Sequence, residues 1–359
     1  MLNSIKTIGK YLDQPLLVGK FSKVVPATLL GGSALYTLHE THKAKKGEKI
    51  KTAINTGLVL SATSVAALVA PKIATKAIGR AYEKVDINKI VRANREIIKE
   101  YTENNQVSEN ISKILNKAKT NVLKPKEIKI LHTEMSKTDA GKKLINKLVP
   151  EPENVTASDI VKDMGRLSIL GFLPVAGGIA GGVAGDLITD KPNWKNKFPN
   201  KIKEGAYQYL ANIFLCNVGA AAALGIMEAA KVTSKSARAL GMVGGIIATG
   251  VVGGSAIANY ISKKVINPLF DKGKQKNVEQ EKSLYSDRKP EMLDVCLHTD
   301  DVATIAVMSG FKWIEPSLPI LYAISGYRAG IGYRNGNGTS NQTIPHEHKH
   351  EFCRQNKKK

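Results

Sequence analysis

The side chains most capable of chemistry gather between Asp294 and Arg334, and the first of them form a polar segment, residues 294 to 301, just ahead of an apolar stretch. The segment contains Asp294, Cys296 and His298, followed by two further aspartates. These residue types could serve acid–base chemistry, but no two of them have a spacing that dictates a catalytic arrangement. Acidic residues just before an apolar helix also cap it and interact favourably with its dipole. We therefore expect helix capping here and no catalytic residue.

A pair of opposite charges interrupts the last apolar stretch, which runs from Val302 to Gly332. Lys312 and Glu315 are three residues apart, so on a helix they would share a face and could pair. Pairing lowers the cost of placing either charge in lipid, and charges in such positions often mark transport pathways. The spacing predicts an intramembrane charge pair, in a segment that Pro316 and Pro319 then break. The alternative is a short amphipathic helix at the membrane surface, with both charges in water.

The cysteines and histidines do not predict a metal centre. Cys216, Cys296 and Cys353 fall in an apolar stretch, a polar segment and the tail, so neither paired disulfides nor a CxxC site is indicated. Alternate histidines between residues 346 and 350 could chelate a metal together with Cys353. The Gly- and Asn-rich lead-in favours a disordered tail instead. We expect no bound metal and no cofactor.

Glycines at a fixed spacing mark the stretch from 167 to 185, which carries no charge. Gly177, Gly181 and Gly185 are spaced by four residues, so on a helix they form a smooth ridge that another backbone can approach closely. In water, each interior glycine would cost a helix about 0.5 to 1 kcal/mol relative to alanine. In lipid, small residues allow close helix packing. We expect these three glycines to be helix-packing positions in a membrane.

Long uncharged stretches recur along the chain. They are Val24–Leu38, Thr52–Pro71, Leu167–Gly185, Gly205–Met227 and Ala239–Ser262. All but the first reach the roughly 17 to 25 residues that a helix needs to cross about 30 Å of hydrocarbon. In the last stretch, Gly241 and Gly245 repeat the spacing of four and predict another helix contact. We therefore expect an all-α, multi-pass helical membrane protein with Gly-rich packed helices.

Average composition conceals this pattern. A mean hydropathy of −0.16, with 43% hydrophobic and 23% charged residues, is typical of a soluble protein. The average misleads because the 53 Lys and Arg residues lie between the apolar stretches. The alternative is a soluble helical protein with Ala- and Gly-rich core helices, but such helices rarely lack charge on every face for about 20 residues.

The excess of positive charge predicts a lipid partner. A net charge of +22 and a pI near 9.7 would suggest nucleic acid in a soluble protein. Here the positive residues are spread over almost every connection, and no nucleic-acid-binding motif accompanies them. Lysines beside apolar spans attract anionic headgroups by roughly 1 kcal/mol each. We expect a bilayer with anionic headgroups as the partner, together with further copies of this chain, and not nucleic acid.

The largest polar region, residues 72 to 165, has apolar residues at helical spacing. Asn104-Asn105 and Lys124-Pro125 mark breaks in that pattern. About three amphipathic helices are expected, either as a small bundle or as a layer against the membrane.

Orientation and location are less constrained. Both sides of the expected spans are rich in lysine, so the positive-inside rule selects neither orientation. The basic N-terminus superficially resembles a targeting sequence, but it lacks a convincing cleavage site, and we expect it to be retained. A bacterial inner membrane is the expected location, and a mitochondrial or chloroplast inner membrane is the alternative.

The predicted organisation has six parts. They are a basic segment with an apolar hairpin (1–71), a polar amphipathic helical region (72–165), three Gly/Ala-rich membrane helices (166–264), a polar linker (265–301), a C-terminal apolar segment (302–333) and a disordered basic His-containing tail (334–359). The sequence favours a non-enzymatic membrane scaffold or membrane-shaping protein assembled through glycine-stepped helices. The alternative is a small transporter or channel subunit that uses the region of Lys312 and Glu315.

Overall fold

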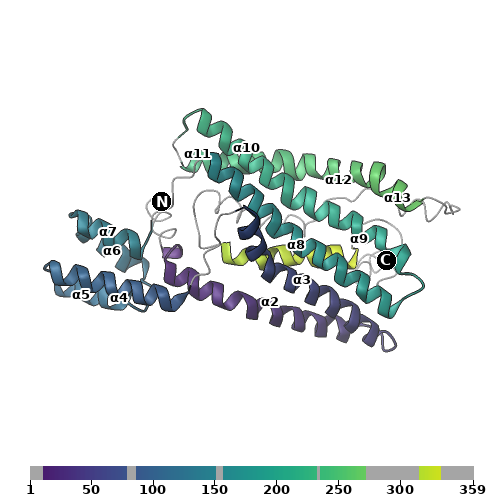
Figure 1. Ribbon diagram of the computed structural model, residues 1–359, viewed down its shortest axis with the longest axis horizontal. Helices are drawn as coiled ribbons and strands as arrows, with labels where there is room; N and C mark the ends of the chain where they lie inside the picture. Colours follow the sequence, from purple (N-terminus) through teal and green to yellow (C-terminus); the bar gives the residue numbers. More distant parts are fainter. Residues whose placement is uncertain (1–10, 79–85, 151–156, 233–234, 272–314, 333–359) are drawn as a thin grey trace, which may run out of the picture.

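The computed structural model describes residues 11–78, 86–150, 157–232, 235–271 and 315–332. Within these ranges the chain is helical and contains no strand, which confirms the expected all-α fold. Long helices lie alongside one another in one bundle, and four shorter helices form a second bundle at one end of it (Figure 1).

The first two long helices form an antiparallel hairpin. Helix α2 runs from Pro15 to Lys43 and α3 from Lys49 to Ile78. Proline at the first position of α2 suits a helix start, because its missing N–H would have no partner there. Hydroxyl oxygens of Ser33 and Ser64 lie 2.9 Å apart in a hydrogen bond across the hairpin.

The polar region forms four helices, one more than the pattern predicted. They are α4 (Ile87–Asn104), α5 (Glu109–Ala118), α6 (Pro125–Met135) and α7 (Asp139–Leu148). The additional break arises because Thr138 caps α7, its hydroxyl oxygen accepting a hydrogen bond from Gly141 N at 3.1 Å. Their apolar faces enclose a core of their own, which includes Ile98, Leu115, Leu131 and Ile145.

A double hydrogen bond joins this small bundle to the start of α2. The Gln14 amide donates from Nε2 to the Leu123 carbonyl oxygen at 2.9 Å, and Leu123 N donates to Gln14 Oε1 at 2.7 Å. Both residues are buried. Because one side chain satisfies both backbone groups of a buried loop residue, the position of the small bundle is tied to that of α2.

Helix α8 (Ala157–Thr189) follows, and after it come two helical rods that each contain π-helical turns. The first rod comprises α9 (Trp194–Tyr209), η1 (Leu210–Phe214) and α10 (Leu215–Ala229). The second comprises α11 (Lys235–Ile246), η2 (Ile247–Gly254), α12 (Ser255–Ile261), η3 (Ser262–Ile266) and α13 (Asn267–Asp271). The rod from α9 to α10 runs back along α8, and the rod from α11 to α13 lies beside α10 (Figure 1).

The last described helix, α17 (Leu318–Ile331), lies inside the long-helix bundle, where it contacts α3, α8 and α9 (Figure 1). A short 3₁₀ turn, Glu315–Ser317, precedes it. The prolines that were expected to break this segment lie at the helix start, and Gly332 ends the helix with a φ of 65°. Residues 302–314 of the predicted apolar segment lie outside the described residues.

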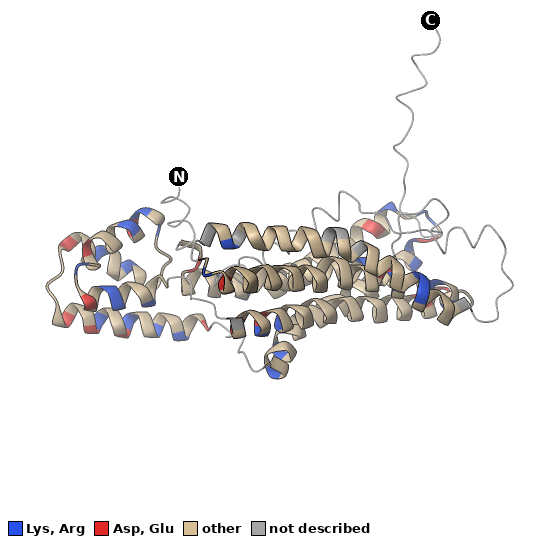
Figure 2. Ribbon diagram, turned by 90° about the horizontal axis from the view of Figure 1, so that it is seen from above, with Lys and Arg blue, Asp and Glu red and all other residues tan. Residues whose placement is uncertain are grey.

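Three helical stretches in the described ranges are long and apolar enough to cross a membrane, judged by length and composition. They are Lys49–Ile78, Ser158–Thr189 and Trp194–Ala229. The expected fifth stretch contributes a shorter apolar helix, Leu240–Gly250, and the first lies within α2. Charged residues crowd the small bundle and the ends of the long helices, whose middle parts are largely uncharged (Figure 2).

Candidate functional site

The glycine ridge of α8 faces α3. A β-carbon built on Gly177 would lie 2.6 Å from Cβ of Ala66, and one on Gly181 would lie 2.8 Å from Cβ of Ala62. Each added β-carbon would also lie closer to an α3 carbonyl oxygen, that of Ala62 or that of Leu58, than β-carbons lie in real proteins. At Gly185 the nearest atom is the side-chain oxygen of Asn55. The three glycines thus permit α8 and α3 to approach more closely than any larger residue would allow.

A second ridge on α8, one position further round the helix, faces α17. A β-carbon on Gly178 would overlap the carbonyl oxygen of Gly326, and one on Gly182 would overlap that of Gly330. Gly326 and Gly330 are themselves closely opposed by carbonyl oxygens of α8. Two backbones therefore touch at successive turns, each through glycines four residues apart. Helix α8 is held between α3 and α17 by these two ridges.

The predicted glycine contact in the last span joins α11 to α10. Gly245 faces the backbone of Gly219, and a β-carbon on Gly245 would also lie 2.9 Å from Cβ of Ala223. A β-carbon on Gly241 would instead meet the flexible end of Met227, with Sδ 2.5 Å away. Gly245 therefore has the stricter steric requirement of the two, because a backbone cannot move aside as a methionine side chain can.

Glu315 forms its ion pair with Arg166 of α8. The Arg166 guanidinium also lies 3.3 Å, Nη2 to Oδ1, from Asp163 one turn earlier. Arg166 and Asp163 are buried, and Glu315 is nearly so. Its predicted partner, Lys312, lies outside the described residues. The contact links the start of α17 to α8 at the end of the bundle nearest the four short helices.

A second ion-pair cluster lies at the opposite end of the bundle. Lys201 Nζ is 3.1 Å from Asp186 Oδ2 and donates a hydrogen bond to the Gly330 carbonyl oxygen at 2.5 Å. Lys197 Nζ lies 2.7 Å from Asp190 Oδ2 and 3.7 Å from Asp186 Oδ1. The hydrogen bond from Lys197 holds the pKa of Asp190 below its ordinary value. This cluster joins α8, α9 and the end of α17.

A ladder of polar side chains runs from this cluster along α9 into η1. Gln208 Nε2 donates to Glu204 Oε1 at 2.7 Å, and Asn212 Nδ2 donates to Gln208 Oε1 at 3.0 Å. The Arg328 guanidinium of α17 lies 3.9 Å, Nε to Oε1, from Glu204. All four side chains are buried. The ladder covers about 12 Å along the helix and is the most site-like polar group inside the long-helix bundle.

The ladder ends where two π-helical segments face each other. Glycines of η2 lie against η1 and the start of α10, because a β-carbon on Gly254 would be 2.7 Å from Cα of Ala211. Thr249 Oγ1 donates to the Leu215 carbonyl oxygen at 2.7 Å, which joins the two rods by a hydrogen bond. Isolated π-turns are frequent at functional sites. Cys216 is also buried here, and its thiol donates to the Ala211 carbonyl oxygen at 3.2 Å.

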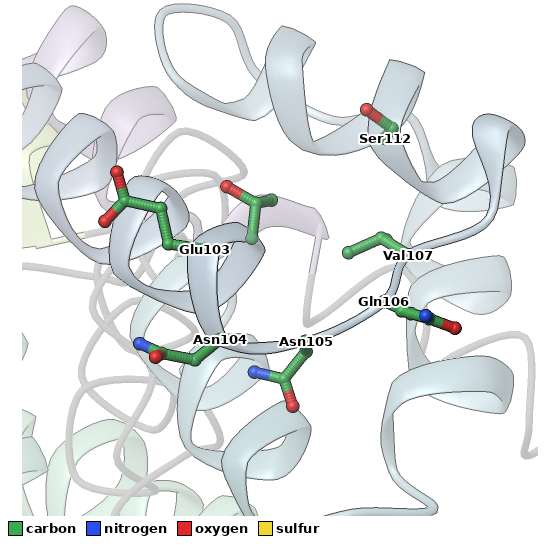
Figure 3. Close-up of a pocket in the computed structure, with 7 residues that line it drawn as sticks. Glu103, Asn104, Asn105, Gln106, Val107 and Ser112 are labelled. Atoms are coloured by element: carbon green, nitrogen blue, oxygen red, sulfur yellow. The ribbon is translucent and has the colours of Figure 1, made fainter.

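An open pocket of about 510 Å³ lies beside the turn between α4 and α5. Its lining is polar and includes Asn104, Asn105 and Gln106 (Figure 3). The amides of Asn104 and Asn105 donate to carbonyl oxygens of α4, so both serve to end that helix. Figure 3 shows the side chains of Asn104 and Gln106 pointing in different directions. The pocket lacks the convergent polar groups of a ligand site.

Among the described residues, no group of three or more His, Cys, Asp and Glu side chains could hold a metal ion. Cys296, Cys353 and the histidines of the tail lie outside those residues, as does the polar segment 294–301. The expectations about them therefore stay predictions.

Searches for similar proteins find no matching family model, no matching curated protein and no matching solved structure. Function is therefore inferred from the geometry of this chain itself.

The polar ladder was not predicted from the sequence. Glu204, Gln208 and Asn212 lie at the edge of an uncharged stretch, where polar residues four apart on one helix face could have revealed it. The partner of Glu315 was also missed, because Arg166 lies 149 positions away in the chain.

Proposed function

We propose that this chain is an integral membrane protein whose long helices cross a bilayer and hold the bundle of α4 to α7 at one membrane surface. Support comes from the two charged ends of the long-helix bundle. Arg166 and Asp186 on α8 are 20 positions apart in the sequence, about 30 Å along an α-helix. Lys51 and Lys72 bound a similar uncharged length on α3. Both lengths agree with the hydrocarbon thickness of a bilayer, about 30 Å.

The close packing inside the bundle favours a non-enzymatic scaffold or membrane-shaping role. One observation carries this proposal: glycine contacts on two sides of α8 bring its backbone against both α3 and α17. An ion pair between Arg166 and Glu315 links α8 to the start of α17 at one end, and at the other Lys201 pairs with Asp186 of α8 and donates to Gly330 of α17. Two pockets in the described part of the chain, one beside the turn between α4 and α5 and one along α3, both open to the surface. A bundle with these properties is suited to stay rigid and to position the domain attached to it.

Alkaline extraction combined with cysteine labelling tests the membrane role. With Cys296 and Cys353 replaced by serine and the buried Cys216 kept, one added cysteine at Lys46 or at Lys143 would report each end of the bundle, since both positions are exposed. The protein is expected to stay in the membrane pellet, and an impermeant maleimide should label the two positions from opposite sides. Release without detergent, or labelling of both positions from one side, would contradict the proposal.

A transporter or channel subunit is the second candidate, and the polar ladder is the observation that favours it. Hydrogen-bonded polar chains inside membrane helices commonly line proton or ion routes. If Glu204 takes part in such a route, Glu204→Gln should abolish ion flux in proteoliposomes while the protein stays folded. Absence of any flux in the unaltered protein would leave the scaffold role as the better proposal.

Location and partners are proposed on the same basis. We propose a bacterial inner membrane as the location, with anionic headgroups and further copies of this chain as partners. The net charge of +22 supports anionic headgroups, and exposed apolar side chains of α2, such as Leu35, support contact with lipid or with a further copy. Fractionation of cells and the molecular mass in detergent would test location and copy number separately.

A further inference from the structure

A shallow apolar groove runs along the outer face of α3, beside α8. It has a volume of about 490 Å³. Its lining residues are Ser61, Ala62, Val65, Ala66, Val69 and Ile73 of α3, with Leu173 of α8. Val65, Val69 and Ile73 are 58%, 44% and 43% exposed, although all three are apolar. Apart from Ile73, the groove residues of α3 lie in its uncharged part, which ends at Lys72 and which the proposed function places in hydrocarbon.

Two lysines continue the same helix face toward the end of α3. Val65, Val69, Lys72 and Lys76 are separated by four, three and four residues, so they form one stripe along the helix. Both lysines are exposed, and no acidic partner is found for either among the described residues. The groove is therefore apolar along its length. It is positively charged at its mouth, the end nearest Lys72 and Lys76.

The length of the groove along α3 matches the thickness of one leaflet of a bilayer. Ser61 and Ile73 are 12 positions apart, about 18 Å along an α-helix. Half of a hydrocarbon core is about 15 Å. Gly165 of α8 lies beside Ile78 of α3, so Lys76 lies near the level of the buried Arg166 that marks the charged end of the bundle. The groove thus extends from this charged level toward the middle of the proposed membrane region.

We propose that this groove binds an acyl chain of an anionic phospholipid, with the headgroup phosphate held by Lys72 and Lys76. The inference rests on the proposed membrane location. Charge complementarity favours an anionic lipid over a neutral one, since each lysine near the surface attracts an anionic headgroup. The same charges disfavour a second copy of this chain, because a two-fold axis through the groove would bring four ammonium groups together.

Native mass spectrometry of the full chain in mild detergent, titrated with phosphatidylglycerol or phosphatidylcholine, would test the assignment. Lys72→Gln with Lys76→Gln removes the charged mouth. Lys45→Gln with Lys46→Gln is the matched control, since it removes two exposed lysines from the turn at the other end of the same hairpin. A third variant, Val65→Phe with Val69→Phe, fills the groove and leaves its charges in place.

The expected result is that phosphatidylglycerol binds more tightly than phosphatidylcholine, and that the first variant loses about tenfold or more of that affinity while the control does not. The phenylalanine variant should weaken both lipids. Equal binding of the two lipids, or equal loss in the first variant and the control, would overturn the inference and leave the membrane location standing. A dimer mass that the phenylalanine variant converts to a monomer would assign the groove to a second copy. Release of the protein by alkaline washing would refute the membrane proposal itself.

Discussion

Replacing Gly181 by alanine should destabilise the long-helix bundle, although alanine is the better helix former. The added methyl carbon would lie 2.8 Å from Cβ of Ala62 and still closer to the carbonyl oxygen of Leu58. The carbonyl belongs to the α3 backbone, so it cannot move aside without shifting that helix. Overpacking of this kind costs about 1 to 3 kcal/mol.

The helix propensity of alanine opposes this effect by about 0.5 to 1 kcal/mol. The net expectation from those two ranges is a destabilisation of up to about 2.5 kcal/mol, centred on about 1 kcal/mol. Gly225→Ala is the matched control, because a β-carbon on this α10 glycine would meet no atom within 4 Å. It should leave stability unchanged or raise it by up to about 1 kcal/mol.

Thermal unfolding of the two variants in the same detergent would measure the difference. Gly181→Ala should unfold at a lower temperature than the unaltered protein, and Gly225→Ala at the same or a higher temperature. If Gly181→Ala proved as stable as Gly225→Ala, α8 and α3 would not be in the close contact on which this reasoning depends.

Three further predictions concern charged groups. Arg166→Met should reduce stability by about 3 to 5 kcal/mol, because it leaves the buried Glu315 carboxylate without this partner, and adding Glu315→Gln should recover part of the loss in the same unfolding assay. Equal stability of the single and double variants would contradict this. Burial opposes ionisation of Glu127, but hydrogen bonds from Lys117 and the backbone outweigh it and lower the pKa of Glu127. Its contribution to stability is therefore complete above the unfolded pKa, about 4.3, and is lost as pH falls through the lower folded value. Protection factors of the amide hydrogens in α5 and α6, which correct for the pH dependence of intrinsic exchange, should fall at low pH, and less steeply in Glu127→Gln; identical pH profiles would refute the role of this carboxylate. Glu204→Leu should destabilise the bundle because it leaves Gln208 and Arg328 without their Glu204 contacts, and an unchanged unfolding temperature would show that the ladder adds no stability.

Local patterns in the sequence predicted much of the helix content. The hairpin, the amphipathic helices after residue 86 and the breaks near Asn105 and Pro125 all follow from spacing and turn residues that act within a few positions. The break before α7 was missed because it depends on one capping side chain, Thr138, in a stretch that otherwise continues the apolar pattern.

Contacts between distant segments could not be predicted in the same way. Four-residue spacing marked the α8 glycines as packing positions, but it could not say that one ridge meets Ala62 and the next meets Gly326. Likewise, Glu315 was recognised as a charge that needs a partner, whereas its pairing with Arg166 depends on how α17 enters the bundle. Spacing identifies a helix face, and only the three-dimensional arrangement identifies what covers it.

The central claim is that the long helices cross a bilayer. The depth at which their exposed apolar positions lie in that bilayer tests it most directly. Spin labels on single cysteines at Leu30 and Val65, both at least half exposed in the uncharged part of the hairpin, would be compared with one at Asp139 on α7. In reconstituted vesicles the first two should collide more often with dissolved oxygen than with a water-soluble nickel complex, and the third should show the reverse. If all three favoured the nickel complex, the long helices would lie in water and the proposed membrane location would be contradicted.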